Sequence, residues 1–410
     1  MCTLWYACCC LCDNGCTVHF FTSITCNYIP KARVLAHSVK QHVPGAVFHL
    51  LLCDRPPEDF DLDKEDFDHL ILLDDLDIDN KAAWIFKRGV VELCTAVKGL
   101  GFQEIFRRFD PDKVIFFDPD IALFSNVDLI EQALNQHSIL LTPHLTEPEQ
   151  AYSAVLDNEV SCLKYGVFNL GFLAVRNTSQ GMSFVNWWSE RLRDFCFDDK
   201  QSGLFTDQKW VDLALAFFPD IGILREPQCN VSTWNLSHRR ATGDITSGIQ
   251  INQRPLCFYH FSGLDSGAQK VMLEVYGEHS PVLLQLRNWY LQQCKQMGQK
   301  QLGQAPCHYQ FYDNGDEISP AERLLYRYRE ELAERFPDPY ACPDSGDSYQ
   351  NWYRRQGGAP QNVPPDSESL WVLQRELDSI HHSISWRITR KMAQLYRKSG
   401  LRLGLRRFIH

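Results

Sequence analysis

Residues 113–121 read Lys-Val-Ile-Phe-Phe-Asp-Pro-Asp-Ile, and this stretch limits the possible folds more than any other. The apolar run Val114 to Phe117 favours a strand and is too short for a helix. Pro119 has no N–H to give to a neighbouring strand, so strand pairing stops there. We therefore predict a buried strand that ends in two carboxylates, those of Asp118 and Asp120.

The two carboxylates are spaced for a metal site. Side chains two residues apart in an extended chain point the same way, so Asp118 and Asp120 can direct oxygens at one point. A hard divalent cation prefers such ligands, and a cation held there can hold a diphosphate. The alternative is a simple turn, because Asp-Pro often follows a strand. The position favours the metal site, since ligands gather at the carboxyl ends of strands in open α/β sheets.

Strand-like and helix-like segments alternate along the chain. Strands are expected over 17–26, 46–53, 69–73, 113–117, 138–142, 167–175, 221–224 and 256–261. Helices are expected over 31–41, 90–109, 182–195, 207–218 and 320–335. This order predicts an α/β fold, in which a mostly parallel sheet is covered by helices on both faces.

Composition narrows the class of protein. A chain of 410 residues with 44% hydrophobic residues can bury a large core. The formal charge of −10 argues against a nucleic-acid binder as a whole, because phosphate backbones require a basic surface. No apolar run reaches the ~18 residues of a membrane span, and the N-terminus does not resemble a secretory signal. We therefore expect a cytoplasmic protein.

Changes in composition predict four parts. Residues 1–16 form a Cys-rich leader with a single C-x-x-C pair and no second pair to complete a zinc site, so we expect disorder there. A globular domain follows over 17–295. An extension rich in Pro and Gly covers 296–380 and holds one helix, and a basic amphipathic tail covers 381–410.

Two further strands carry polar residues near their ends. Asn169 and Gly171 fall where a strand begins, and the glycine permits close approach of a ligand, although Asn-x-Gly is often only a turn. His260 lies in an aromatic strand just before a Ser-Gly turn. An imidazole of this kind can complete a metal site with Asp118 and Asp120, whereas the alternative is a packed core histidine.

Thr206-Asp207-Gln208 begins an expected helix. Thr206 has the chemistry of an N-cap, and an acidic side chain at position 207 is stabilised by the positive end of a helix. These residues have two possible roles. They could simply cap the helix, or they could belong to a functional site.

Taken in order, these segments resemble a known family. A first strand with Thr22 and Tyr28 is followed by FFDPDI, FNLGFLAV, TDQ, QCNVSTWNL and YHFSG, an order similar to bacterial GT-A glycosyltransferases related to glycosyltransferase family 8. The resemblance covers about residues 17–265. Residues 315–352 and 385–389 also look like the C-terminal extension of bacterial sugar transferases.

The resemblance implies a GT-A fold, a Rossmann-like mixed sheet flanked by helices, with a helical and irregular C-terminal extension. It implies a hexosyltransferase-type enzyme that moves a sugar from a nucleotide-sugar donor to a glycan or lipid-linked acceptor, with retention of the anomeric configuration. The cofactor would be Mn²⁺ or Mg²⁺, with Asp118, Asp120 and His260 as protein ligands.

The same resemblance implies roles for other residues. Those that would bind the donor are Thr22, Tyr28 against the base, Asp118 at the ribose, Asn169 and Gly171 at the sugar, and Gly263. Asp207 and Gln208 would act near the reacting carbon. The family usually carries Lys-Pro-Trp after this glycine, with the lysine on the diphosphate, but this chain has Leu264-Asp265-Ser266. Lys98, on the expected helix before the strand that ends in Asp118, could replace the missing lysine as the cation that contacts the diphosphate.

Two other functions remain open. A metal-dependent nucleotidyltransferase or phosphohydrolase would use the same carboxylates with a second metal and further ligands, which the other strand ends scarcely supply. A non-catalytic sugar-binding domain would present Trp187, Trp188 and Trp234 as a surface platform.

The tail predicts where the protein resides. Residues 385–408 interleave apolar and basic side chains, a pattern that binds anionic bilayers, so we expect peripheral attachment to the inner face of the cell membrane. A helix docked on the protein or an oligomer contact is the alternative.

Deleting residues 385–410 should release the protein from anionic vesicles but spare transfer to a soluble acceptor analogue. Binding of the full chain should also weaken with salt, since charges are screened within ~10 Å at 0.1 M ionic strength. Co-sedimentation with vesicles measures both effects. Equal pelleting of the two forms would remove the membrane hypothesis.

Overall fold

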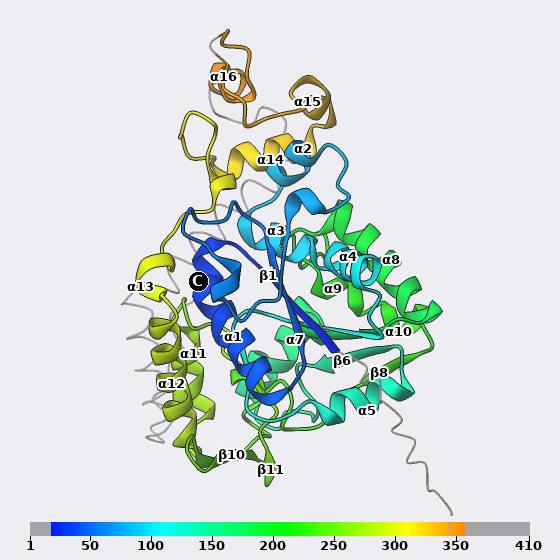
Figure 1. Cartoon of the computed structure of the whole chain (residues 1–410), viewed down its shortest axis with the longest axis vertical. Helices are drawn as coiled ribbons and strands as arrows, with labels where there is room; N and C mark the ends of the chain where they lie inside the picture. Colours follow the sequence, from blue (N-terminus) through cyan, green and yellow to red (C-terminus); the bar gives the residue numbers. More distant parts are fainter. Residues whose placement is uncertain (1–17, 344, 357–410) are drawn as a thin grey trace, which may run out of the picture. The chain divides into compact units, whose positions relative to one another are not determined.

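The protein is built around a seven-stranded sheet, seen in a computed structural model that describes residues 18–343 and 345–356 (Figure 1). In spatial order the strands are β3 (His69–Leu72), β2 (Val47–Leu52), β1 (Val18–Ile24), β4 (Lys113–Phe117), β7 (Phe168–Arg176), β6 (Ile139–Pro143) and β8 (Ile221–Ile223). β7 is antiparallel to both neighbours, and the other pairs are parallel. The mostly parallel α/β sheet predicted from the sequence is therefore confirmed.

Helices cover both faces of this sheet. On one face, α1 (Ile29–His42) and α5 (Asp128–Gln136) share an apolar core with alternate strand residues such as Phe20. On the other face lie α4 (Lys98–Phe109) and α8 (Ser179–Phe195), where the Phe21 and Phe102 ring centroids are 4.8 Å apart. Successive strand residues point to opposite faces, so Phe20 and Phe21 enter different layers. The central strands are thus buried on both sides.

A short second sheet begins directly after β4. The backbone N–H of Asp118 donates to the Gly171 carbonyl on β7 at 2.8 Å, and the Ile121 N–H closes a turn onto the Asp118 carbonyl at 3.1 Å. The chain then forms β5 (Ile121–Leu123), which pairs antiparallel with β12 (Phe258–His260). In this register His260 lies opposite Ile121. Strand pairing therefore brings a histidine from late in the sequence beside the two aspartates.

The remaining elements lie mainly around this framework. They are α2 (Lys81–Phe86), α3 (Val90–Ala96), the helical segment 152–165 that ends in α7 (Val160–Tyr165), α9 (Gln208–Val211), α10 (Ala214–Phe217), a three-stranded sheet of β9 (Ala241–Asp244), β10 (Gly248–Ile251) and β11 (Arg254–Pro255), and then α11 (Ala268–Tyr276), α12 (Val282–Gln296) and α13 (Gln299–Leu302). The single helix predicted over 207–218 is wrong, since α9 and α10 are separate short helices.

The chain divides into two compact units between Ile318 and Ser319. The described part of the second unit holds α14 (Pro320–Tyr328), α15 (Glu330–Arg335) and α16 (Tyr349–Arg355). Extended backbone at Arg329 interrupts the helix predicted over 320–335. The expected leader (1–16) and basic tail (381–410) lie outside the described residues. Within the described ranges, no helix is long and apolar enough to cross a membrane.

One side-chain contact joins α1 to the strand that follows the aspartates. The buried Ser38 hydroxyl donates to the Leu35 carbonyl at 2.7 Å and accepts from the Leu123 N–H at 3.0 Å. A buried backbone N–H without a hydrogen-bond acceptor destabilises the folded state by the full free energy of its desolvation. Ser38 therefore holds β5 in place through one hydrogen bond.

Ser38→Ala should lower the free energy of unfolding by about 1–3 kcal/mol, because the Leu123 N–H would be left unpaired. Urea denaturation measures this change. The control is Ser183→Ala on the exposed face of α8, where the hydroxyl bonds only its own helix and we expect a change below about 0.5 kcal/mol. Equal effects of the two variants would contradict the linking role.

Candidate metal and donor site

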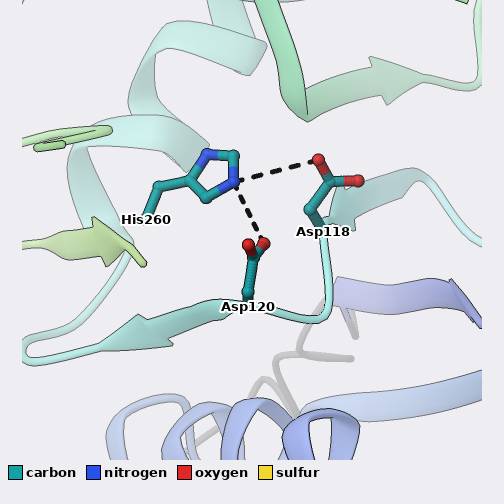
Figure 2. Close-up of side chains that lie close together, drawn as sticks. All are labelled: Asp118, Asp120 and His260. Carbon is teal, nitrogen blue, oxygen red and sulfur yellow. Dashed lines mark ion pairs between the residues drawn. The ribbon is translucent and has the colours of Figure 1, made fainter. Parts of the chain in front are cut away.

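Three side chains converge at the carboxyl end of β4. Figure 2 shows Asp118 and Asp120 on the turn after β4 and His260 at the end of β12, pointing toward one another. The His260 Nε2 atom lies 3.0 Å from Asp120 Oδ1 and 4.0 Å from Asp118 Oδ2. One ligand atom from each residue lies within 4.8 Å of the others, a spacing that can hold a metal ion. Carboxylate oxygens with one imidazole nitrogen fit Mn²⁺ or Mg²⁺.

A chain of hydrogen bonds sets the orientation of His260. Its Nδ1 atom lies 3.1 Å from Asn169 Oδ1, which also accepts from Asn230 Nδ2 at 3.1 Å. The Asn169 amide nitrogen faces His144 Nε2 at 3.3 Å, and burial lowers the pKa of His144 to about 4, which keeps that ring neutral and able to accept. Since an amide oxygen only accepts, a neutral His260 carries its proton on Nδ1. The Nε2 lone pair is then available for a metal.

Gly171 permits the close packing of this ring. A Cβ atom at this position would lie 2.5 Å from His260 Cε1 and 2.9 Å from Asn169 Oδ1, which is too close for any side chain. The group that closely approaches Gly171 in the structure is therefore the His260 imidazole. Whether Asn169 and Gly171 also face a donor sugar stays a prediction.

Burial and neighbouring charges set the ionisation of the three side chains. Burial would lower the pKa of His260, but the Asp120 carboxylate outweighs this and raises it. Burial would raise the pKa of Asp120, but His260 lowers it instead. For Asp118, burial dominates and raises the pKa against the opposing effect of Lys98. Since a ligand histidine must be neutral, a metal ion has to compete with the proton on His260.

Lys98 connects this cluster to the predicted catalytic residues. Its buried ammonium lies 2.8 Å from Asp207 Oδ2, 3.1 Å from Asp118 Oδ1 and 3.0 Å from the Leu170 carbonyl. Burial would lower the pKa of Lys98, but the two carboxylates raise it above its usual range. An ammonium has three N–H groups, and three protein acceptors face this one. The geometry therefore does not favour Lys98 as the cation that contacts a diphosphate.

Asp207 and Gln208 serve contacts other than helix capping. Thr206 is not the N-cap, because it has a left-handed φ of 44° and its hydroxyl donates to Asp207 Oδ1 at 3.0 Å. Positive φ is strained for a β-branched residue and persists only where the surroundings enforce it. Gln208 Oε1 accepts from the Leu170 N–H at 3.1 Å and its Nε2 donates to the Tyr165 carbonyl at 2.9 Å. Gln208 is thus held against the start of β7, whereas Asp207 is held by Thr206 and Lys98.

The other predicted donor residues lie in different surroundings. The Tyr28 hydroxyl donates to Asp265 Oδ2 at 2.7 Å, and after burial the carboxylates of Asp265 and Asp120 raise the pKa of Tyr28. Gly263, with a φ of 75°, turns the chain three residues after His260. Thr22 is fully buried inside β1, a position that does not favour contact with a donor.

Two residues near the cluster were not expected there. The sequence suggested Trp234 only for the surface platform of a sugar-binding domain, and it gave Asn230 no site role. The Trp234 ring packs edge-on against His144 and His260, with ring centroids 5.3 and 5.2 Å apart. Asn230 holds Asn169, as described above. Asn230 and Trp234 both belong to the segment QCNVSTWNL. The position of this segment among the ordered motifs was the one sequence feature that could have placed them near the site. Lys31 carries no sequence signal of this kind, and its contacts are described below.

Comparisons with known proteins do not identify a substrate. No protein-family model matches the chain. The uncharacterized protein YfnD of Bacillus subtilis (strain 168) is 23% identical over 259 residues, which are 62% of this chain and 80% of YfnD. The uncharacterized protein YfnF of the same organism is 23% identical over 175 residues, which are 42% of this chain and 56% of YfnF. The chain thus spans only about half of YfnF.

Glycosyltransferases are among the solved structures that match. The galactosyltransferase LgtC, in complex with donor and acceptor sugar analogs, has 14% identity and a TM-score of 0.41, covering 71% of this chain and 97% of LgtC. The glycosyltransferase GlyE of Streptococcus pneumoniae TIGR4 has 17% identity and a TM-score of 0.40. The match covers 72% of this chain and 67% of GlyE. Likeness at this level does not identify a function, so the functional proposal rests on the site residues. Membership of glycosyltransferase family 8 stays a prediction.

Gly171→Ala should weaken Mn²⁺ binding by about ten- to a hundredfold, because the added methyl group displaces the His260 ring. Isothermal titration with Mn²⁺ measures the affinity. Gly89→Ala is the matched control, since its Cβ would meet no atom closer than 3.8 Å. Unchanged Mn²⁺ affinity in the Gly171 variant would show that the position of the imidazole does not matter for metal binding.

Proposed function

We propose that this protein is a glycosyltransferase that moves a sugar from a nucleotide-sugar donor to a glycan or lipid-linked acceptor with the help of Mn²⁺ or Mg²⁺. The observation that supports it best is the convergence of Asp118, Asp120 and His260 at the carboxyl end of the central strand β4. Ligands of α/β sheets bind at such strand ends. The ordered motifs around the three residues favour sugar transfer over other metal chemistry.

The residues match the charge changes of the reaction. Cleavage of a glycosyl–phosphate bond develops positive charge on the sugar ring and negative charge on the departing diphosphate. When bound, the divalent ion supplies Lewis-acid stabilisation of that negative charge. Asp118 and Asp120 would hold the ion with carboxylate oxygens and His260 with Nε2, while Asn169 keeps the imidazole oriented. Retention of configuration is part of the proposal, on the family resemblance alone.

Asp207 and Gln208 are proposed to act next to the reacting carbon. Asp207 shares Lys98 with Asp118, so it lies close to the metal-binding turn. Gln208 bonds the backbone N–H of Leu170, next to Gly171. Lys98 would act as a positioning residue that holds two carboxylates at a fixed separation, in place of the diphosphate contact expected from the sequence.

The alternative functions have less support. A two-metal phosphohydrolase or nucleotidyltransferase needs a second set of ligands, and the residues that the structure describes contain no second cluster of three suitable side chains. A sugar-binding platform needs exposed tryptophans. Trp188 is fully buried, and Trp187 packs against Phe217 and Phe218.

Product analysis tests the proposal. The protein is incubated with Mn²⁺ and a panel of UDP-, GDP- and dTDP-sugars, with lipid and glycan extracts as acceptors. Release of a nucleoside diphosphate together with a glycosylated product supports glycosyl transfer. Release of a nucleoside monophosphate would instead favour the nucleotidyltransferase or phosphohydrolase.

Asp120→Ala should reduce transfer by at least about a hundredfold, because the metal ion loses a ligand and the departing charge loses its stabilisation. The fold should be retained, since Asp120 lies on a turn outside the apolar core. Donor turnover and circular dichroism measure the two effects. Asp79→Ala, which removes a largely exposed carboxylate, should leave both unchanged, and full activity of the Asp120 variant in metal-replete buffer would refute the metal site.

Gln208→Ala should lower kcat by about ten- to a hundredfold and change donor affinity by less than about threefold, because its proposed place is at the reacting carbon and not at the nucleotide. Single-turnover kinetics and nucleotide titration separate the two quantities. If the variant bound the nucleotide more weakly but turned over normally, the proposed place of Gln208 at the reacting carbon would be wrong.

A further inference from the structure

A departing diphosphate needs more positive charge than the residues described so far supply. Asp118, Asp120 and Asp207 bring three carboxylates to the end of β4. Lys98 is already surrounded by three protein acceptors. The segment after Gly263 has Leu264 where the family resemblance places a lysine, and the acidic Asp265 follows it. Stabilising the departing charge therefore calls for a second cation near the metal site, one with free N–H groups.

Lys31, in the first turn of α1, meets this description. Its ammonium lies 2.5 Å from Asp265 Oδ2 and 4.0 Å above the centre of the Tyr28 ring. Among the described residues Asp265 is its sole hydrogen-bond acceptor, so two of its three N–H groups have no protein acceptor. The Tyr28 hydroxyl donates to the same Asp265 oxygen at 2.7 Å. One carboxylate thus holds both the ammonium and the ring expected to contact a nucleobase.

The two partners of this ion pair differ in their exposure to solvent. The Lys31 side chain is 3% exposed, whereas that of Asp265 is 56% exposed. An exposed anion therefore covers a buried cation. A buried ion pair is weak evidence for stability, because the cost of removing both charges from water offsets their attraction. An anionic ligand that replaces the exposed carboxylate would find the ammonium already in place.

Lys31 lies on a helix that packs beside the turn carrying Asp118 and Asp120. Val34, further along α1, shares a buried core with Ala122 and Tyr259, which lie within two residues of Asp120 and His260 in the sequence. The helix that carries Lys31 is fixed to β5 through Ser38. Asp265 follows His260 by five residues, in a turn bounded by Gly263 and Gly267, whose φ angles are 75° and 76°. Glycine adopts such angles without strain, so this turn can change conformation at low cost.

We propose that Lys31 binds the diphosphate of the donor and that Asp265 is an internal anion that occupies this place until the donor arrives. This inference rests on the proposed function. On binding, a phosphate oxygen would replace the Asp265 carboxylate at the ammonium, and the Tyr28 ring would be released from Asp265. Lys31 would then face the negative charge that develops as the glycosyl–phosphate bond breaks.

Two substitutions that break the same ion pair separate this role from a structural one. In full-length protein with Mn²⁺, Lys31→Met should weaken binding of a nucleoside diphosphate by about ten- to a hundredfold, since a charged hydrogen bond is lost. Asp265→Asn should tighten binding by roughly tenfold, because the competing anion is removed. Lys40→Met is the matched control, as Lys40 lies on the same helix and pairs with Asp68 away from the site.

Isothermal titration with UDP, GDP and dTDP measures these affinities, and thermal unfolding checks each variant. Opposite shifts for Lys31→Met and Asp265→Asn support the proposal. Shifts in the same direction, or lower melting temperatures with unchanged affinity, overturn it and make the pair structural. If Lys31→Met does not fold, the Asp265→Asn shift decides alone.

Inorganic diphosphate separates failure of this inference from failure of the proposed function. If the wild-type protein binds none of the three nucleotides, the proposed function falls. Binding of inorganic diphosphate that Lys31→Met weakens would still support the role of Lys31. Nucleotide binding that Lys31→Met leaves unchanged would overturn the role of Lys31 and leave the proposed function standing.

Discussion

Negative charge accumulates at the end of β4, and the arrangement of the site depends on how that charge is balanced. Asp118, Asp120 and Asp207 lie together, Asp207 buried and the other two partly exposed, and like charges in such surroundings repel unless cations are close. His260 balances Asp120, and Lys98 balances both Asp118 and Asp207. A divalent ion would replace the proton of His260 in this balance. This balance suits a site that could receive a cation and, through it, the anionic donor that we propose.

The topology of the sheet creates this concentration of charge. β4 lies in the middle of the sheet, and the chain leaves it through the Asp118–Asp120 turn to form β5 beside β12. That pairing delivers His260, and β7, antiparallel to β4, delivers Asn169 and Gly171. The helix α4 delivers Lys98 from the opposite face. Four separate segments thus meet at one strand end, which is where α/β proteins bind ligands.

Local patterns in the sequence predicted the strands of the main sheet and the place of Asp118 and Asp120 after one of them, because strand ends, proline and the spacing of side chains act over a few residues. They failed where the deciding partner is distant. Thr206 and Asp207 look like a helix cap in isolation, yet the Lys98 ammonium is the partner of Asp207. Lys31 and Asp265 are separated by more than two hundred positions, and no local rule pairs them. The contact of Asn169 with the His260 ring also joins distant parts of the chain, and no local pattern indicated it.

The most direct test of the metal site is anomalous diffraction at the manganese absorption edge, from crystals soaked with Mn²⁺ and UDP. The account predicts one strong anomalous peak in contact with Asp118, Asp120 and His260 Nε2, with diphosphate density on the side of Lys31. Crystals of the Asp120→Ala variant should lose the peak. A peak elsewhere in the wild-type protein, or nucleotide density without manganese between the aspartates and His260, would contradict the central claim.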